Sequence, residues 1–196
     1  MGDKGNGHAG GNDHQALLGI IRRQGLRRLD EPVELACGAM SNDFIDVKLA
    51  LCRWADLQVA CRAIVRRVRT AGIDFNAAGG MTMGADPLAV GIAAETGGHW
   101  FSIRKTPKNR GTNQLIEGTP LGTEHRVLLL EDATTTGGSS QKAYRAVGDT
   151  GAEVVAVATV VDRGDTARQS YGELGVPYFP LLTYADLDIE PVIPPD

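Results

Sequence analysis

Cysteine is scarce in this chain. Cys37, Cys52 and Cys61 are the three cysteines among 196 residues, and their spacing is not that of metal ligands. The sequence therefore gives no reason to expect a cysteine metal site. An odd number of widely separated thiols instead predicts free or buried cysteines in a reducing cytoplasm.

Long apolar runs are also absent. No stretch approaches the length that spans a bilayer, and the N-terminus lacks the basic, apolar and small-residue regions of a signal peptide. We therefore expect no membrane association. The net charge of -4 disfavours non-specific binding of nucleic acid as the main activity. The sequence contains no internal repeat.

The remaining composition is that of a globular protein. Hydrophobic residues make up 42% of the chain and charged residues 22%, which suits one domain with a full core. We expect residues 1–12, rich in glycine, to form a disordered leader. A single domain is predicted over residues 13–190, with a small lobe at about 13–55 and a core at about 56–185. Residues 191–196 then form a loose tail.

The most informative stretch runs from residue 126 to residue 140. The apolar residues Val127–Leu130 are bounded by turn formers and predict a buried parallel strand. That strand ends at two acids, Glu131 and Asp132. A Thr/Gly/Ser cluster at residues 133–139 follows and opens a helix. Its main-chain N–H groups and the helix dipole favour a bound phosphate.

The acidic pair Glu131 and Asp132 needs a separate explanation, because carboxylates repel phosphate. These acids suit the vicinal hydroxyls of a ribose, or the outer shell of a metal. The alternative is a pair of solvated acids before a flexible turn. The stretch is not a Walker A loop, since no Gly-Lys-Ser/Thr follows, and its glycine spacing is not that of a dinucleotide fingerprint.

Strands and helices alternate along the rest of the chain, which predicts an α/β fold with a parallel sheet and helices on both faces. We expect Asp13 and Asp86 to be helix N-caps. Helices are predicted at residues 13–29, 55–71, 86–96, 139–147 and 167–174. Core strands are predicted at residues 74–78, 100–103, 126–130, 154–161 and 178–182, and a hairpin at residues 33–35 and 44–47.

Three further features lie where core strands end. Residues 79–85 form a glycine-rich loop before a helix, which is either a second anion site or an ordinary connecting loop. Residues 104–112 carry four cations, and we favour a mobile lid over a polyanion rather than a solvated loop. Arg163 follows a continuous β-branched strand, where its planar guanidinium suits a carboxylate ligand. A salt bridge with Asp162 or Asp165 is the alternative.

The stretch Glu131–Ser139 resembles the phosphoribosyl-pyrophosphate (PRPP) motif of type I phosphoribosyltransferases, and it is most similar to that of orotate phosphoribosyltransferases. Residues 78–87 resemble the pyrophosphate loop of this family, and residues 104–112 resemble its catalytic loop. Residues 41–48 resemble the small N-terminal lobe, called the hood, that covers the base. Three motifs in the expected order are more specific than any one of them.

Two positions depart from the family pattern. Many members carry a base-contacting lysine just before a Ser-Gly pair in the hood, whereas this chain has Ala36-Cys37-Gly38 there. Lys48 lies beyond that place. In the catalytic loop, Arg110 stands where the family has histidine, which keeps the positive charge but removes a titrating group.

The resemblance implies a type I phosphoribosyltransferase core with an N-terminal hood. It also implies Mg2+-dependent transfer of a phosphoribosyl group from PRPP to orotate, giving orotidine 5'-monophosphate and pyrophosphate. The Mg2+ would be carried by PRPP, without direct protein ligands. The catalytic loop reaches into the neighbouring subunit's site in this family, so a homodimer with shared active sites is expected.

The resemblance also assigns roles to individual residues. The catalytic cations are Arg104, Lys105, Lys108 and Arg110. The residues that bind PRPP are Gly79, Gly80, Met81, Thr82, Met83, Glu131, Asp132, Ala133, Thr134, Thr135, Thr136, Gly137, Gly138 and Ser139. The residues that contact orotate are Thr135 and Arg163.

Two other functions stay open on the sequence alone. The first is a phosphoribosyltransferase for another base, such as a purine or uracil. The second is a non-catalytic regulator that binds PRPP. No helix-turn-helix pattern is evident, although the arginine-rich segments at residues 22–28 and 62–69 could bind RNA.

Overall fold

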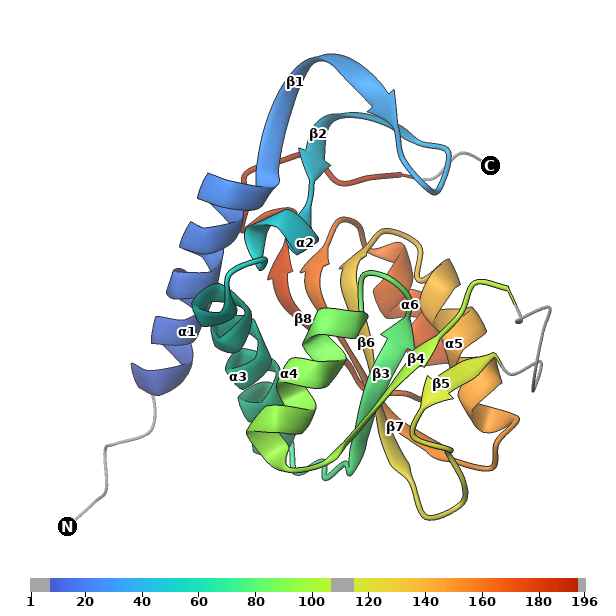
Figure 1. Ribbon diagram of the computed structural model, residues 1–196. Helices are drawn as coiled ribbons and strands as arrows, with labels where there is room; N and C mark the ends of the chain where they lie inside the picture. The colour runs from blue at the N-terminus through green and yellow to red at the C-terminus, as the bar shows by residue number, and fades with distance from the viewer. Residues whose placement is uncertain (1–7, 107–114, 194–196) are drawn as a thin grey trace.

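The computed structural model describes residues 8–106 and 115–193 (Figure 1). Its N-terminal part consists of α1 (His8–Ile20), the π-helix η1 (Ile21–Gly25), β1 (Leu26–Glu34), β2 (Met40–Ile45), α2 (Val47–Ala50) and α3 (Trp54–Thr70). Its core continues with β3 (Ala77–Met81), α4 (Asp86–Thr96), β4 (His99–Ile103), β5 (Ile116–Gly118), β6 (Arg126–Thr134), α5 (Gly138–Gly148), β7 (Glu153–Asp162), α6 (Thr166–Glu173) and β8 (Tyr178–Thr183).

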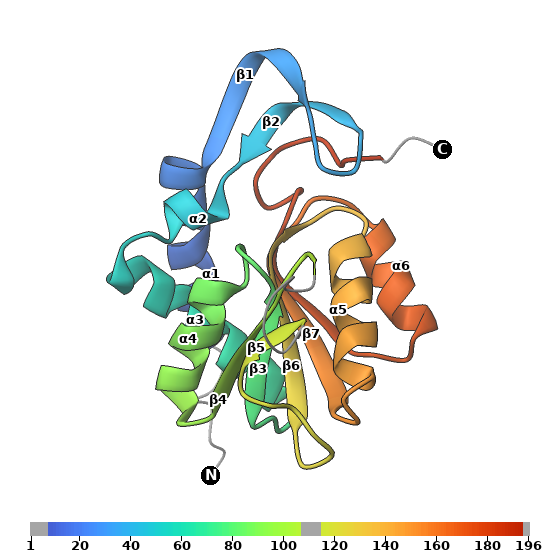
Figure 2. The same cartoon turned by 45° about the vertical axis from the view of Figure 1, so that its right-hand side comes forward.

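A six-stranded sheet forms the centre of the core, in the order β5-β4-β3-β6-β7-β8. Its strands pair in parallel, except that β5 runs antiparallel to β4. Figures 1 and 2 show α1, α3 and α4 over one face of the sheet and α5 and α6 over the other. The expected α/β fold with a parallel sheet is confirmed.

The apolar run in β6 is buried because both of its faces are covered. Leu128 and Leu130 belong to the core cluster that includes residues of α1, α3 and α4. Val127 and Leu129 pack in the other cluster, with residues of α5 and α6. Successive side chains of a strand point to opposite faces, so a central strand of this kind needs an apolar residue at every position. Among the described residues, no helix is both long and apolar enough to cross a membrane.

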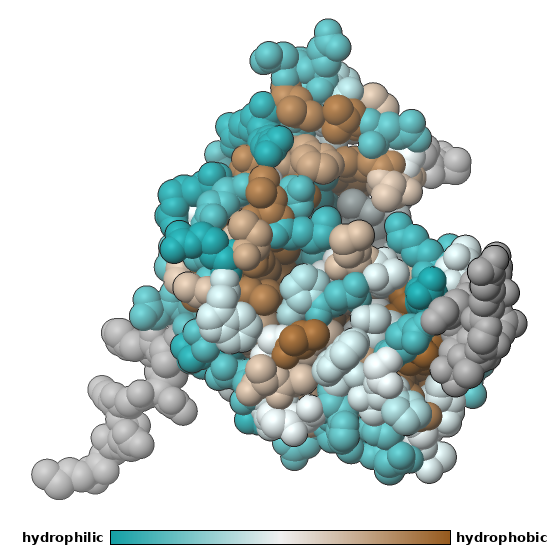
Figure 3. Space-filling model, viewed as in Figure 1, coloured by the Kyte–Doolittle hydropathy of each residue, from teal (hydrophilic) through white to brown (hydrophobic). Residues whose placement is uncertain are grey.

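The hood is the β1–β2 hairpin together with α2. Leu26 pairs with Ile45 at one end of the hairpin and Glu34 with Met40 at the other. The hairpin stands above the sheet edge where the parallel strands end (Figures 1 and 2). Figure 3 shows apolar surface along the hairpin and a hollow between the hairpin and the core. The hood therefore covers the edge at which ligands of open α/β sheets bind.

The N-terminal helix differs from the sequence-based prediction. It begins at His8, so the expected leader boundary at residue 12 falls inside α1. It also does not run to residue 29, because Leu26 already begins β1 and pairs with the second strand of the hairpin. Asp13 is not an N-cap, because it lies inside α1. Its Oδ2 instead lies 2.7 Å from Arg66 Nη1 in an ion pair with α3. Tertiary pairing here overrides the local helical pattern.

The hairpin and the first core strand also have other bounds than predicted. The predicted strands at residues 33–35 and 44–47 correspond to the longer β1 and to β2. The predicted strand at 74–78 is β3, which begins at Ala77 and continues through Gly79 and Gly80. Asn76 precedes it and accepts a hydrogen bond of 2.8 Å from Arg126 N through its side chain.

Three further details were not predicted correctly. Ala85, rather than Asp86, is the N-cap of α4. The Asp86 carboxylate instead accepts hydrogen bonds of 2.7 Å from the hydroxyls of Thr82 and Ser102. Strand β5 was not expected, because three residues are too few for a period to show. The strand predicted at 126–130 is longer, because β6 continues through Thr134, so Glu131 and Asp132 lie within the strand rather than after it. The other predicted core elements are present, with small shifts at their ends.

Candidate functional site

Four connecting loops gather at one edge of the sheet. They follow β3, β4, β6 and β7, which are parallel, so all four leave at the carboxyl ends of their strands. Thr134 at the end of β6 pairs with Asp162 at the end of β7. Figure 2 shows the hood hairpin above these loops. Residues that are far apart in the sequence are thereby brought to one place.

The loop after β6 has the geometry of a phosphate site. Gly137 adopts a left-handed conformation with φ of 77°, which favours glycine, and α5 begins at the next residue. Gly138 N donates a 3.3 Å hydrogen bond to the Thr136 hydroxyl. The first turn of α5 contains no acidic residue that would compete with an anion. The loop and helix start thus direct N–H groups and partial positive charge toward the sheet edge.

The two acids of β6 have different surroundings. Glu131 is buried, whereas the Asp132 side chain retains 20% of its exposure. Asp132 Oδ2 lies 3.3 Å from Lys48 Nζ, which comes from α2 of the hood. A methyl group at Gly84 would overlap the Asp132 carboxylate. Asp132 is therefore the accessible acid, held between the hood and the loop after β3.

Lys48 was not among the site residues predicted from the sequence. Its ammonium also lies 3.6 Å from Asp46 Oδ1, and Asp46 caps α2 by accepting a 3.0 Å hydrogen bond from Leu49 N. No local motif links Lys48 to the acid of β6. The sequence could place Lys48 only within the hood-like segment 41–48, not against Asp132.

The predicted pyrophosphate loop divides between a strand and a turn. Gly79 and Gly80 are buried within β3, where a methyl group would overlap the carbonyl oxygens of Phe101 and Leu130 on the neighbouring strands. Thr82 and Met83 lie beyond the strand, joined by a cis peptide bond, and the Met83 side chain is 71% exposed. The loop surface therefore comes from the residues after Met81.

Arg163 is buried at the carboxyl end of β7 with 4% exposure. Its Nη2 donates hydrogen bonds of 2.8 Å to Asp43 O and 3.2 Å to Ser41 Oγ, both in the hood. Its Nε has no hydrogen-bond partner in the described part of the chain. Burial lowers the pKa of this guanidinium, while Asp43 and Cys37 act in the opposite direction. A buried cation with a free N–H is suited to an anionic ligand.

The alternative salt bridges of Arg163 are not formed within residues 8–106 and 115–193. Asp162 Oδ1 instead accepts a 3.2 Å hydrogen bond from Gly164 N. Burial raises the pKa of the Asp162 carboxyl, although the hydrogen bond from Gly164 N acts to lower it. Asp165 accepts a 3.3 Å hydrogen bond from the hydroxyl of Tyr184. The two acids fix the loop after β7 rather than neutralise the arginine.

The basic loop after β4 is described only at its start. Arg104 Nη1 lies 3.6 Å from Glu117 Oε1 of β5, and Arg104 N donates a 2.9 Å hydrogen bond to Leu115 O. Lys105 is exposed. Lys108 and Arg110 lie outside the described residues. The loop thus leaves from the same edge as the phosphate loop.

A cavity of about 280 Å³ lies between the hood and the loop after β3. Lys48, Cys52, Gly84, Pro87 and Asp132 are among its lining residues. It therefore lies beside the accessible acid of β6. No cluster of three or more His, Cys, Asp or Glu side chains suited to a metal occurs in the described residues.

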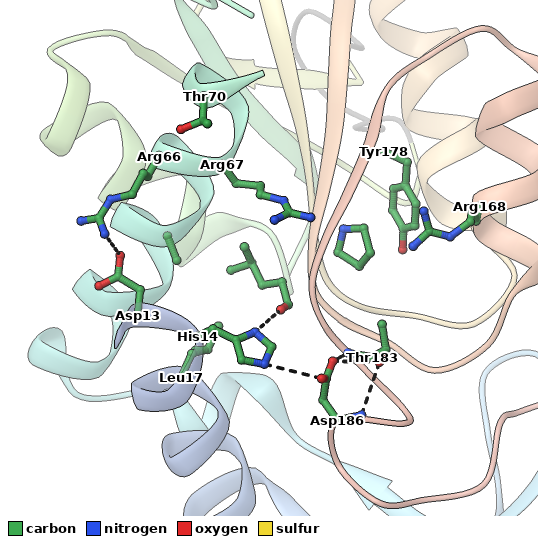
Figure 4. A pocket seen from close by; sticks show the side chains of 13 residues that line it. Asp13, His14, Leu17, Arg66, Arg67, Thr70, Arg168, Tyr178, Thr183 and Asp186 are labelled. Atoms are coloured by element: carbon green, nitrogen blue, oxygen red, sulfur yellow. Dashed lines mark hydrogen bonds and ion pairs between the residues drawn. The ribbon is translucent and has the colours of Figure 1, made fainter. Parts of the chain in front are cut away.

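A larger cavity, of about 430 Å³, lies beside β8 and is bordered by α1 and α3 (Figure 4). Contacts that dock α1 cross it: Asp13 pairs with Arg66, and His14 Nδ1 lies 3.2 Å from Leu181 O. His14 Nε2 also lies 3.5 Å from Asp186 Oδ1. None of the predicted site residues lines this cavity, so we assign it to the packing of α1.

The chain is similar to known proteins over most of its length. The family model described as "Phosphoribosyl transferase domain" matches residues 61–174. An orotate phosphoribosyltransferase of Pyrococcus abyssi is 38% identical over 153 residues, covering 78% of this chain and 84% of that protein. The orotate phosphoribosyltransferase of Mycobacterium bovis is 37% identical over 185 residues, covering 92% of this chain and 99% of that protein.

Solved structures are similar as well. The crystal structure of Mycobacterium tuberculosis orotate phosphoribosyltransferase in complex with PRPP superposes with a TM-score of 0.73 at 35% identity. The match covers 90% of this chain and 99% of that one. The similarity therefore extends over the hood and the core together.

Proposed function

Because this chain belongs to the phosphoribosyltransferase family and is an enzyme of that family, we propose that it transfers a phosphoribosyl group from PRPP to orotate. The products are orotidine 5'-monophosphate and pyrophosphate, so the enzyme acts in pyrimidine synthesis. The observation that carries the choice of orotate is Arg163, a buried guanidinium beneath the hood with an unpaired Nε. Orotate is the anionic base that such a group recognises through its carboxylate.

The PRPP half of the site follows from the loop after β6. The N–H groups of residues 133–139 bind the 5'-phosphate at the start of α5. The carboxylates of Glu131 and Asp132 accept hydrogen bonds from the ribose hydroxyls. The segment 79–83 lines the path of the diphosphate. The partly accessible position of Asp132 beside a cavity supports this arrangement.

The base half of the site lies beside Arg163. Arg163 N donates a 2.8 Å hydrogen bond to Thr134 O, and the Thr135 carbonyl lies beside Gly164. We place the orotate ring between Thr135 and Arg163, under the hood hairpin. Binding of the orotate carboxylate would satisfy the unpaired Nε of Arg163, and it supports orotate over an uncharged base.

Charge governs the chemical step. Orotate N1 forms a bond to C1 of the ribose and gives up its proton to the leaving diphosphate, while the bond from C1 to the diphosphate breaks. C1 gains positive character and the leaving diphosphate gains negative charge. Arg104 and Lys105 neutralise that charge, and the resemblance of the loop to the family's catalytic loop assigns the same role to Lys108 and Arg110. The hood covers the bound substrates and excludes water, which would otherwise hydrolyse PRPP.

Magnesium enters this scheme bound to PRPP. Glu131 and Asp132 carry carboxylate oxygens, the donors that Mg2+ prefers, close to the carboxyl end of β6 where the ribose would lie. They would hold the ion through the ribose hydroxyls and water rather than as direct ligands. When bound, Mg2+ supplies positive charge at the diphosphate.

The proposal includes a homodimer in the cytoplasm. The loop after β4 would supply its cations to the neighbouring subunit's site, in line with the resemblance of that loop to the family's catalytic loop. The unpaired state of Cys37, Cys52 and Cys61 agrees with a reducing compartment.

Product analysis tests the proposed reaction. The protein is incubated with PRPP, Mg2+ and orotate, and the products are identified by mass spectrometry. The proposal predicts equal amounts of orotidine 5'-monophosphate and pyrophosphate, and loss of both when EDTA removes Mg2+. Release of pyrophosphate without any nucleotide would contradict it. A nucleotide made only from uracil or a purine would favour the alternative acceptor base.

A further inference from the structure

We propose that Lys48 binds the diphosphate group of PRPP, an inference that rests on the proposed function. Lys48 belongs to the hood, whose residues 41–48 were expected only to cover the base. Its contacts instead bring it to Asp132, the acid proposed to hold the ribose, beside the loop after β3.

The position of Lys48 is set by three neighbours. Its Nζ lies 3.3 Å from Asp132 Oδ2 and 3.6 Å from Asp46 Oδ1. It lines the cavity of about 280 Å³ together with Gly84, which belongs to the loop after β3. If Asp132 holds the ribose and that loop lines the diphosphate path, the ammonium lies where the two meet.

The loop after β3 cannot neutralise a diphosphate by itself. Residues 79–86 contain no lysine or arginine. Asp86 adds a negative charge, and its carboxylate accepts hydrogen bonds from the hydroxyls of Thr82 and Ser102. A diphosphate bound there needs cations from elsewhere. The hood supplies Lys48 from one side, and the loop after β4 of the neighbouring subunit would supply cations from the other.

Lys48 and the ribose hydroxyls compete for the same carboxylate. The Asp132 oxygens are the acceptors proposed for the ribose, yet Oδ2 is paired with Lys48 in this structure. The Lys48 side chain is 48% exposed and its stem is flexible, so the ammonium can leave Asp132. The ribose then takes the carboxylate while Lys48 turns to the diphosphate. PRPP thereby replaces one ion pair with another.

A purely structural ion pair predicts the opposite effect on binding. If Lys48 only neutralises Asp132, its removal frees the carboxylate, and PRPP then binds as well as before or more tightly. If Lys48 binds the diphosphate, its removal weakens the binding of PRPP and pyrophosphate. The binding of ribose 5-phosphate, which lacks a diphosphate, stays unchanged. The direction of the change in PRPP affinity therefore distinguishes a structural role of Lys48 from a diphosphate-binding role.

The test is calorimetric titration of the full-length protein with PRPP, pyrophosphate and ribose 5-phosphate in the presence of Mg2+. The variants are Lys48→Met, which keeps the stem, and Lys48→Arg, which keeps the charge. Arg69→Met is the matched control, because Arg69 is exposed near the end of α3, away from the loops of the site. Thermal unfolding of each variant checks that the fold is intact.

Lys48→Met is expected to weaken the binding of PRPP and of pyrophosphate by about tenfold to a hundredfold. Lys48→Arg should stay within a few-fold of the wild type, and Arg69→Met should not change binding. Equal or tighter PRPP binding by Lys48→Met overturns the inference, and so does an equal loss for ribose 5-phosphate. If the wild type binds neither PRPP nor pyrophosphate, the proposed function itself fails, and the role of Lys48 fails with it.

Discussion

Arg163 at the end of β7 donates a 2.8 Å hydrogen bond to the main-chain carbonyl of Asp43 in the hood hairpin. The same Nη2 lies 3.2 Å from Ser41 Oγ. The hood is thus tied to the core through the side chain that is proposed to recognise the base. Recognition of orotate and the position of the hood therefore depend on one guanidinium.

Replacement of this guanidinium should separate base binding from PRPP binding. We expect Arg163→Ala to lower kcat/KM for orotate by about a hundredfold, because it removes a charged hydrogen-bond donor. The Kd for PRPP should change much less than the KM for orotate, because Arg163 makes no proposed contact with PRPP and can act on it only through the position of the hood. Steady-state kinetics and calorimetry measure the two effects.

The control for Arg163→Ala is Arg168→Ala, on the exposed surface of the neighbouring helix α6. It removes a nearby positive charge without touching the hood, and it should leave the KM for orotate unchanged. Equal losses for orotate and PRPP in Arg163→Ala would show that Arg163 supports the fold of the whole site instead.

Gly84 should be required for the position of Asp132. A methyl group at Gly84 would overlap the Asp132 carboxylate, so Gly84→Ala must displace that side chain. We expect the KM for PRPP to rise about tenfold, because the displaced carboxylate loses one charge-assisted hydrogen bond to the ribose. The control is Gly148→Ala, at a helical position with open space around it. That change should leave KM unaltered and stabilise α5 by up to about 1 kcal/mol. An unchanged KM in Gly84→Ala would separate Asp132 from PRPP binding.

Shared active sites predict complementation between two inactive variants. Arg163→Ala removes the base contact of one site, and Lys105→Ala removes a cation that is proposed to act in the neighbouring subunit's site. Random mixing after denaturation and refolding makes half of the dimers hybrid, and each hybrid has one intact site. Activity should then return to about a quarter of the wild-type value. Mixtures no more active than the separate variants would mean that each subunit uses its own loop.

Cys61 should make the protein less stable at high pH. Burial, and then the charge of Glu95, raise the pKa of its thiol from 9.0 to about 12. The unfolded chain therefore ionises this thiol first. The contribution of the protonated thiol to the free energy of unfolding is fully present below pH 9. It is lost as the pH rises toward 12, by about 4 kcal/mol at most.

Urea unfolding at several pH values measures this effect. The free energy of unfolding should fall less steeply above pH 9 in Cys61→Ala than in the wild type. Cys52→Ala, at an exposed cysteine, should follow the wild-type slope. Parallel curves for the wild type and Cys61→Ala would show that the thiol ionises as easily in the folded protein.

The sequence predicted those parts of the fold that have a strong local pattern. The β-branched run in β7 is buried on both faces, and such runs are visible without tertiary information. Leu26, Arg27 and Arg28 have no such pattern, since they become a strand only by pairing with residues 43–45. The helix that was expected to continue through them gives way to this pairing.

The same distinction applies to the site. The acids and the glycine-rich loop after β6 follow one another in the sequence, so their proximity could be predicted. The contact between Lys48 and Asp132 joins the hood to the core, and it depends on how α2 packs. Likewise, Gly79 and Gly80 look like loop residues by type, yet they serve the close approach of neighbouring strands. Such roles become visible only in three dimensions.

A comparison of bases tests directly whether orotate is the acceptor. Loss of orotate absorbance is followed after addition of PRPP and Mg2+, with uracil, adenine and hypoxanthine assayed in parallel. The account predicts turnover of orotate with a kcat/KM at least about a hundredfold above that of any uncharged base, as expected for a site built around a buried arginine. Turnover of another base without orotate, or tight PRPP binding without turnover of any base, would contradict it.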